Sequence, residues 1–172
     1  MDTQAGGEPR VLVIGVGNED RGDDAVGRIV ARRLKEELTD GATVLEASGE
    51  GTALMAAWKG ADAVVLIDAA HSGGEPGRLY RLEAHAQPIP ANVLHCSTHA
   101  INAADAIELA RALGELPTRL VVYGIEGKSF EAGVGLSPEA EKAAQEVVRL
   151  VRQEVGWRAP SARMLEAARK HP

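Results

Sequence analysis

Short apolar segments alternate with longer amphipathic segments along this chain. Apolar and β-branched runs of strand length lie at 11–14, 42–47, 63–67 and 119–125, and each run predicts a buried strand. A fifth segment, 77–82, alternates apolar and charged residues, which is typical of an exposed edge strand.

Between these runs, apolar residues recur at helical spacing. Val26, Val30 and Leu34 stand four residues apart with charged residues between them, as on one face of a helix. Spacing of this kind predicts helices over 24–38, 52–58, 99–113 and 138–155. Strands that alternate with helices predict an α/β fold, with an open, mostly parallel sheet of about five strands and helices on both faces. Ligands of such sheets bind beyond the carboxyl ends of the strands, so the residues there are the first candidates for a site.

Length and composition predict one domain with two short extensions. The 172 residues are 45% hydrophobic and 26% charged, as in an ordinary globular protein. We expect a single domain over residues 10–156, between a flexible N-terminal arm (1–9) and a basic C-terminal tail (157–172).

Charge and cysteine content exclude several classes of protein. The net charge of −6 disfavours nucleic-acid binding, because phosphate neutralisation needs a basic surface. The longest continuous apolar run, 63–67, is too short to span a membrane, and no secretory signal is visible, so we expect a cytoplasmic protein. The lone cysteine, Cys96, excludes an intramolecular disulfide and a cysteine-rich zinc site.

The loop after the first strand contains glycines and four acidic residues. Gly15 and Gly17 suggest a dinucleotide-binding turn, but that fingerprint requires a glycine where this chain has Asp20. The acidic residues would also repel a pyrophosphate. The glycines therefore indicate a tight turn or a close approach of the backbone to another group.

Asp23 and Asp24 open the first helix, and two interpretations of them stay open. In one, Asp23 caps the helix and Asp24 lies in its first turn, where the helix dipole favours acids. In the other, one of the carboxylates points into the cleft at the strand ends, where Asn18 and Arg21 orient it or bind a partner.

Two further residues are placed at the same edge of the predicted sheet. Asp68 follows the apolar run AVVLI directly, and a carboxylate is seldom found at the buried end of a strand unless it is paired or ligates something. His99 begins a predicted helix that Ser97 or Thr98 would cap, on the face shared by residues 103, 106, 109, 110 and 113. Asp24, Asp68 and His99 together offer two carboxylates and one imidazole, a set that suits a divalent metal ion.

Four stretches of the chain resemble the hydrogenase maturation proteases. They are VLVIGVGNEDRGDDAVG, LIDAAHSGGEPG, STHAINAADAIELARALG and LVVYGIEGKSFEAGVGLSPEAEKA, and the likeness covers roughly residues 10–156. The resemblance implies a three-layer α/β/α fold with a twisted, mixed sheet of the phosphorylase/hydrolase-like kind. It also implies that Asp24, Asp68 and His99 contact the metal and act in catalysis. The chain departs from the family where Glu126-Gly127 replaces a usual proline-containing pair.

The same resemblance implies a function. These endopeptidases remove the C-terminal peptide of a [NiFe] hydrogenase large-subunit precursor after nickel has been inserted. The nickel arrives in the substrate, so no permanent metal is expected, and Gly15, Gly17 and Asn18 would contact the substrate. Water would be activated either by the metal or by a carboxylate. A nucleotide-binding Rossmann-like module and a non-catalytic nickel-sensing chaperone are the alternatives.

Overall fold

The computed structural model describes residues 10–90, 93–94 and 100–156. These contain a five-stranded sheet, four α-helices and one 3₁₀ turn. In chain order they are β1 (Val11–Val16), η1 (Gly22–Ala25), α1 (Val26–Glu37), β2 (Thr43–Ala47), α2 (Gly51–Trp58), β3 (Ala63–Ala70), β4 (Leu79–Glu83), α3 (Ala103–Leu113), β5 (Arg119–Glu126) and α4 (Pro138–Gly156).

The sheet is mixed, with the strand order β2-β1-β3-β5-β4. The first four strands in this order run parallel, and β4 joins the edge antiparallel to β5. The carboxyl ends of β1, β3 and β5 therefore lie at the same edge of the sheet, which we call the carboxyl edge. This topology confirms the predicted mostly parallel sheet and its exposed edge strand.

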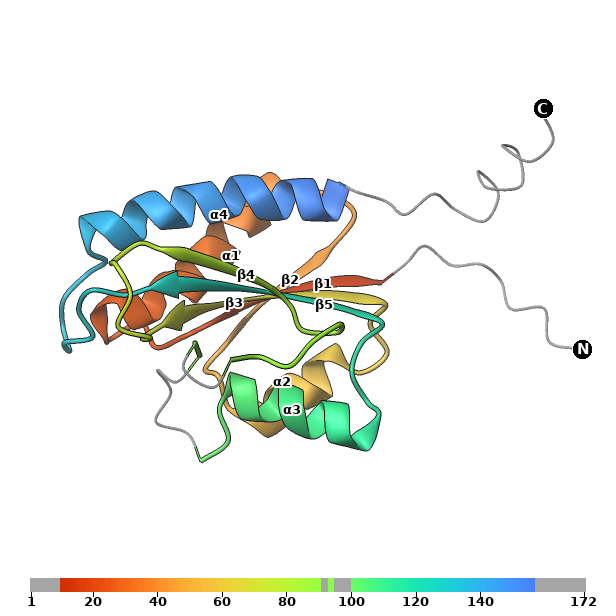
Figure 1. Ribbon diagram of the computed structural model, residues 1–172. Helices are drawn as coiled ribbons and strands as arrows, with labels where there is room; N and C mark the ends of the chain where they lie inside the picture. The colour runs from red at the N-terminus through yellow and green to blue at the C-terminus, as the bar shows by residue number, and fades with distance from the viewer. Residues whose placement is uncertain (1–9, 91–92, 95–99, 157–172) are drawn as a thin grey trace, which may run out of the picture.

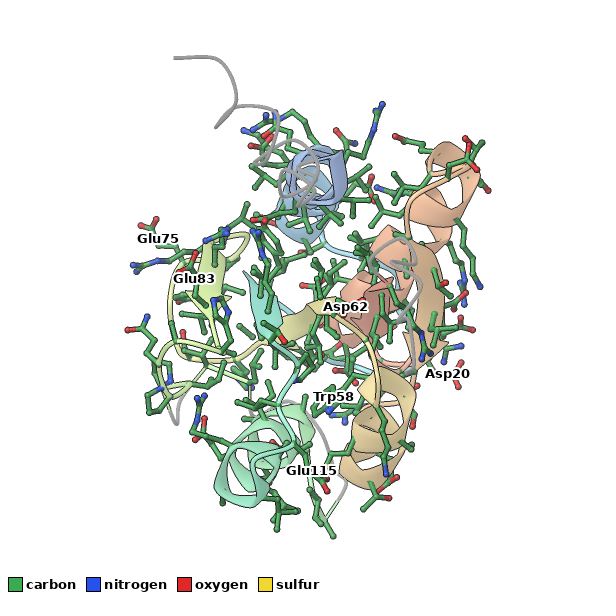
Figure 2. All side chains as sticks on the ribbon, turned by 90° about the vertical axis from the view of Figure 1, so that its right-hand side faces the viewer. Asp20, Trp58, Asp62, Glu75, Glu83 and Glu115 are labelled. Atoms are coloured by element: carbon green, nitrogen blue, oxygen red, sulfur yellow. The ribbon has the colours of Figure 1, made fainter. Side chains whose placement is uncertain are left out.

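Two helical layers cover the sheet (Figure 1). Helices α1 and α4 pack on one face, over a core built from Val, Ala, Leu and Ile side chains. Helices α2 and α3 pack on the other face, where Trp58 is 2% exposed within a second core cluster. Figure 2 views the sheet from its amino edge, with these two layers on opposite sides. In the described part of the chain, no helix is long and apolar enough to cross a membrane.

Two predicted helix starts are wrong. Helix α1 begins at Val26, because residues 22–25 form the 3₁₀ turn instead. Helix α3 begins at Ala103 rather than 99, because Asn102 accepts a hydrogen bond from the Asp105 amide while the Asp105 side chain accepts one from the Asn102 amide. The inward face of α3 also differs from the prediction, since Leu109 and Leu113 are 40% and 59% exposed. The predicted start of the last helix, with Ser137 as its cap, is confirmed.

Candidate active site

Buried polar side chains concentrate at the carboxyl edge. Among the described residues, the polar or charged side chains classed as buried are those of Asp23, Asp24, Asp68, Asn102 and Glu126. Asp23 and Asp24 follow β1, Asp68 lies near the end of β3, Glu126 ends β5, and Asn102 caps α3. Burying a charge is costly unless it is paired or hydrogen-bonded, so such a concentration marks a candidate functional site.

Asp68 lies inside the central strand, two residues before its end. Side chains alternate between the faces of a strand, so Asp68 lies on the same face as Val64 and Leu66, toward α2 and α3. It is 4% exposed. Its Oδ1 accepts a hydrogen bond of 2.8 Å from the amide of Ala69. In the described part of the chain, no cationic side chain pairs with it.

The carboxyls of Asp68 and Asp24 interact electrostatically. Burial and, to a smaller extent, the negative charge of Asp24 together raise the pKa of Asp68 to about 8. Asp24 is itself 6% exposed and is held in the η1 turn. Near neutral pH the side chain of Asp68 is therefore largely protonated. The site can hold a proton on one carboxyl beside a second carboxyl, an arrangement suited to acid and base chemistry.

Asp23 does not cap helix α1, which corrects the interpretation of the acidic pair. Its side chain is fully buried and reaches the segment between β5 and α4. Asp23 Oδ2 accepts hydrogen bonds from the Lys128 amide at 2.7 Å, the Ser129 amide at 3.2 Å and the Ser137 hydroxyl at 2.8 Å. Asp23 Oδ1 accepts a hydrogen bond of 2.7 Å from the Ser137 amide. Asp23 thus fixes the turn that carries Asp24 against the beginning of α4.

The glycines of the first loop allow close packing within the chain. A Cβ atom on Gly15 would lie 2.1 Å from the carbonyl oxygen of Gly27 in α1. A Cβ atom on Gly17, which has a φ of +151°, would lie 1.8 Å from the carbonyl oxygen of Asp24. Gly15 therefore lets β1 approach α1, and Gly17 lets the loop after β1 approach the turn that carries Asp24. Their contact with a substrate stays a prediction.

Asn18 is exposed, and its Oδ1 accepts a hydrogen bond of 3.0 Å from the amide of Asp20. This contact shapes the exposed tip of the first loop. Its predicted role in substrate binding remains untested, as does that of Arg21, which is half-buried.

The third predicted ligand, His99, lies outside the described residues, as do His95 and Cys96. Within the described residues, no group of three His, Cys, Asp or Glu side chains is arranged to hold a metal ion. Asp24 and Asp68 interact electrostatically, and the assignment of Asp24, Asp68 and His99 as metal ligands stays a prediction. His71 is exposed and its ring stacks on that of Phe130, with 4.8 Å between the ring centroids.

Sequence reasoning missed the structural importance of Glu126. It ends the apolar run LVVYGI, just as Asp68 ends AVVLI, so the same signal was present in both strands. The Glu126 side chain is 1% exposed and accepts hydrogen bonds from the loop after β3. An acidic residue directly after a run of apolar residues therefore indicates a buried carboxylate at the carboxyl edge in both strands.

Comparisons with known proteins place the chain in a family. The model of the hydrogenase maturation protease family matches residues 28–154, a range that includes Asp68 and leaves out Asp24. The Hydrogenase 2 maturation protease of Escherichia coli K12 is 30% identical over 136 residues, which are 77% of this chain and 82% of that protein.

Solved structures agree. The [NiFe] hydrogenase maturation protease HybD from Thermococcus kodakarensis superposes with a TM-score of 0.68 at 28% identity, covering 85% of this chain and 99% of that one. The hydrogenase maturating endopeptidase HybD of E. coli superposes with a TM-score of 0.63 at 27% identity, covering 84% of this chain and 93% of that one. The chain therefore belongs to the hydrogenase maturation protease family and is a peptidase.

Proposed function

We propose that this peptidase removes the C-terminal peptide of a [NiFe] hydrogenase large-subunit precursor after nickel insertion, and that it recognises the bound nickel. The observation that supports this proposal is the buried pair Asp24 and Asp68 at the carboxyl edge, because open α/β sheets commonly bind ligands beyond this edge. Family membership supports the peptidase chemistry, and the relatives of the chain are named for the maturation of hydrogenases.

The nickel ion belongs to the substrate in this proposal. Asp24, Asp68 and His99 would complete its coordination, so a precursor without nickel would lack one anchor at the site. The oxygen and nitrogen donors of this set suit a borderline divalent ion. Binding of a cation also favours the ionised form of Asp68, so the proton that Asp68 holds near neutral pH would leave as the substrate binds.

Peptide hydrolysis requires a polarised carbonyl and an activated water. We propose that Asp24 orients the attacking water, and that a carboxylate of the pair Asp24 and Asp68 accepts the proton of this water and passes it to the leaving amine. The hydrogen bonds of Asp23 support this function indirectly, because they fix the η1 turn and with it the backbone of Asp24.

The test compares two forms of the precursor. Nickel-loaded and nickel-free large-subunit precursors are incubated with the wild-type protein, and intact mass is measured over time. We expect loss of the C-terminal peptide from the nickel-loaded precursor alone. Asp68→Asn should abolish this loss. The matched control Asp40→Asn, an exposed aspartate in the turn between α1 and β2, should leave it unchanged.

Two other outcomes would contradict the proposal. Equal cleavage of both precursors would show that nickel is not recognised. Stable binding of the nickel-loaded precursor without any cleavage would favour the nickel-sensing chaperone. The nucleotide-binding alternative has lost its basis, because Gly15 and Gly17 pack against the chain's own backbone and the family is one of peptidases.

A further inference from the structure

Glu126 is a buried carboxylate that the proposed chemistry does not use. It is the last residue of β5 and lies beside Ala70 of β3, two residues beyond Asp68. Its Oε1 accepts hydrogen bonds from the amides of Ser72 at 2.9 Å and Gly73 at 3.0 Å. Its Oε2 accepts a hydrogen bond of 2.7 Å from the Ser72 hydroxyl.

These contacts keep Glu126 ionised. Burial of the carboxyl would by itself raise its pKa, but the hydrogen bonds from the Ser72 hydroxyl and amide, the Tyr80 hydroxyl and the Gly73 amide outweigh burial and lower it. Charge-assisted hydrogen bonds of this kind are shorter and stronger than those between neutral groups. The start of the loop after β3 is therefore held by a charged acceptor.

The backbone of Glu126 holds the other end of the same loop. Its carbonyl oxygen accepts a hydrogen bond of 2.8 Å from the Gly77 amide, and its amide donates one of 2.9 Å to the Arg78 carbonyl. The Tyr80 hydroxyl lies 2.8 Å from the Ser72 Oγ and adds a further contact. One residue thus fixes both ends of the segment 71–78, which we call the β3–β4 loop.

This loop needs such support because its sequence is flexible. It reads HSGGEPGR, and Gly73 and Gly77 both have a φ of +81°, a conformation that glycine adopts readily. Glycine also loses more backbone entropy on ordering than any other residue. Removal of the Glu126 side chain would take away the acceptor of the Ser72 and Gly73 amides.

We propose that Glu126 is a positioning residue that holds the β3–β4 loop as one wall of the substrate-peptide site. The loop begins directly after the strand that carries Asp68, at the carboxyl edge where Figure 1 shows the ends of β3 and β5 together. A wall held in place before binding avoids the cost of ordering it when the peptide arrives. This inference rests on the proposed function and names a residue that determines affinity for its substrate.

The test separates substrate binding from the chemical step. Glu126→Ala should raise KM for the nickel-loaded precursor about tenfold and leave kcat within about threefold, because the loop contacts peptide rather than reacting atoms. Hydrogen exchange of the Ser72 and Gly73 amides should become faster in the same variant. Glu126→Gln keeps an oxygen that can accept from both amides, so KM should return to within about threefold of the wild-type value.

The matched control is Glu115→Ala. Glu115 is an exposed glutamate after α3, labelled in Figure 2, at the opposite end of the sheet, and its removal should change neither KM nor amide exchange in the loop. If Glu126→Ala does not fold, Ser72→Ala keeps both amide contacts, removes the contacts of the Ser72 hydroxyl with Glu126 and Tyr80, and should raise KM about threefold.

Each result either supports or overturns the role of Glu126 as a positioning residue. Faster amide exchange with an unchanged KM would overturn the inference, as would a fall in kcat at constant KM, or failure of Glu126→Gln to restore KM. An unchanged KM in Ser72→Ala would overturn it where the alanine variant of Glu126 cannot be studied. A wild-type protein that leaves the nickel-loaded precursor intact would overturn the proposed function first, and this inference with it.

Discussion

The carboxylates of Glu154 and Asp68 are both largely buried, but only that of Glu154 contacts cationic side chains among the described residues. Glu154 of α4 is 12% exposed and contacts the guanidinium groups of Arg81 and Arg119, each at 2.6 Å. The Tyr123 hydroxyl donates a further hydrogen bond of 3.0 Å to it. Asp68, at the carboxyl edge, accepts one hydrogen bond from its neighbour's amide and faces the like charge of Asp24.

We interpret this difference as that between a structural carboxylate and one that serves the proposed function. The cost of burying Glu154 is offset by two cations and a hydroxyl within the protein itself. The corresponding cost for Asp68 is not offset by any cation in the described part of the chain, and the raised pKa of its carboxyl records this. Such a site costs the fold free energy, which is expected where a charge or a proton is needed for binding or catalysis.

The largest expected effect is on activity. Asp68→Asn should lower the rate of precursor cleavage by about a thousandfold or more, because it removes an acid or ligand while keeping the shape of the side chain. Glu154→Gln should leave the rate unchanged and lower the free energy of unfolding by about 2 kcal/mol, since it weakens two ion pairs. Cleavage assays and urea unfolding of both variants measure this. A Glu154→Gln variant that cleaves slowly but unfolds with the wild-type free energy would contradict the structural role of Glu154.

The second effect is on the pH dependence of stability. Asp68 has a usual pKa near 3.8 in the unfolded chain and about 8 in the folded protein. Between these values the folded state binds more protons than the unfolded state, so this group makes the protein less stable as pH rises. The slope is at most about 1.4 kcal/mol for each pH unit; it has half this value at the two pKa values and falls toward zero outside the range between them.

Asp68→Asn removes this dependence. At pH 9 the free energy of unfolding of Asp68→Asn should exceed that of the wild type. The difference between these two free energies should become steadily smaller as pH falls to 5. Glu154→Gln should show no such convergence. Urea unfolding of the three proteins at four pH values provides the measurement, and parallel curves for wild type and Asp68→Asn would show that the pKa of Asp68 is not raised.

The third effect concerns Asp23, the neighbour of Asp24. Asp23→Asn should lower the free energy of unfolding by about 3 kcal/mol, because both carboxylate oxygens accept hydrogen bonds and an amide NH₂ would face a donor wherever it is placed. Asp20→Asn is the matched control, with an exposed side chain in the same loop. Thermal and urea unfolding report the difference. A loss of 1 kcal/mol or less would show that these long-range hydrogen bonds contribute little to stability.

The sequence predicts most of the fold and part of the site, for physical reasons. Continuous apolar runs identified the strands because parallel strands are buried on both faces, and Val26, Val30 and Leu34 identified the buried face of α1. The long-range partners of Asp23 could not be predicted, since its acceptor atoms meet residues more than a hundred positions away. The start of α3 was misplaced because several residues of that segment can cap a helix, and the local capping box between Asn102 and Asp105 selects Asn102.

The smallest expected effect tests the structural side of the comparison. Tyr123→Phe removes the hydroxyl that donates to Glu154 and leaves both arginines in place, so the free energy of unfolding should fall by about 1 kcal/mol. Burial and the charge of Glu154 raise the pKa of Tyr123 to about 12, so the wild type also loses stability as pH rises from 10 to 12. The phenylalanine variant should lack that loss and should cleave the precursor at the wild-type rate. A cleavage rate reduced tenfold in Tyr123→Phe would mean that the Glu154 cluster and the carboxyl edge are coupled, and that the two carboxylates are not independent.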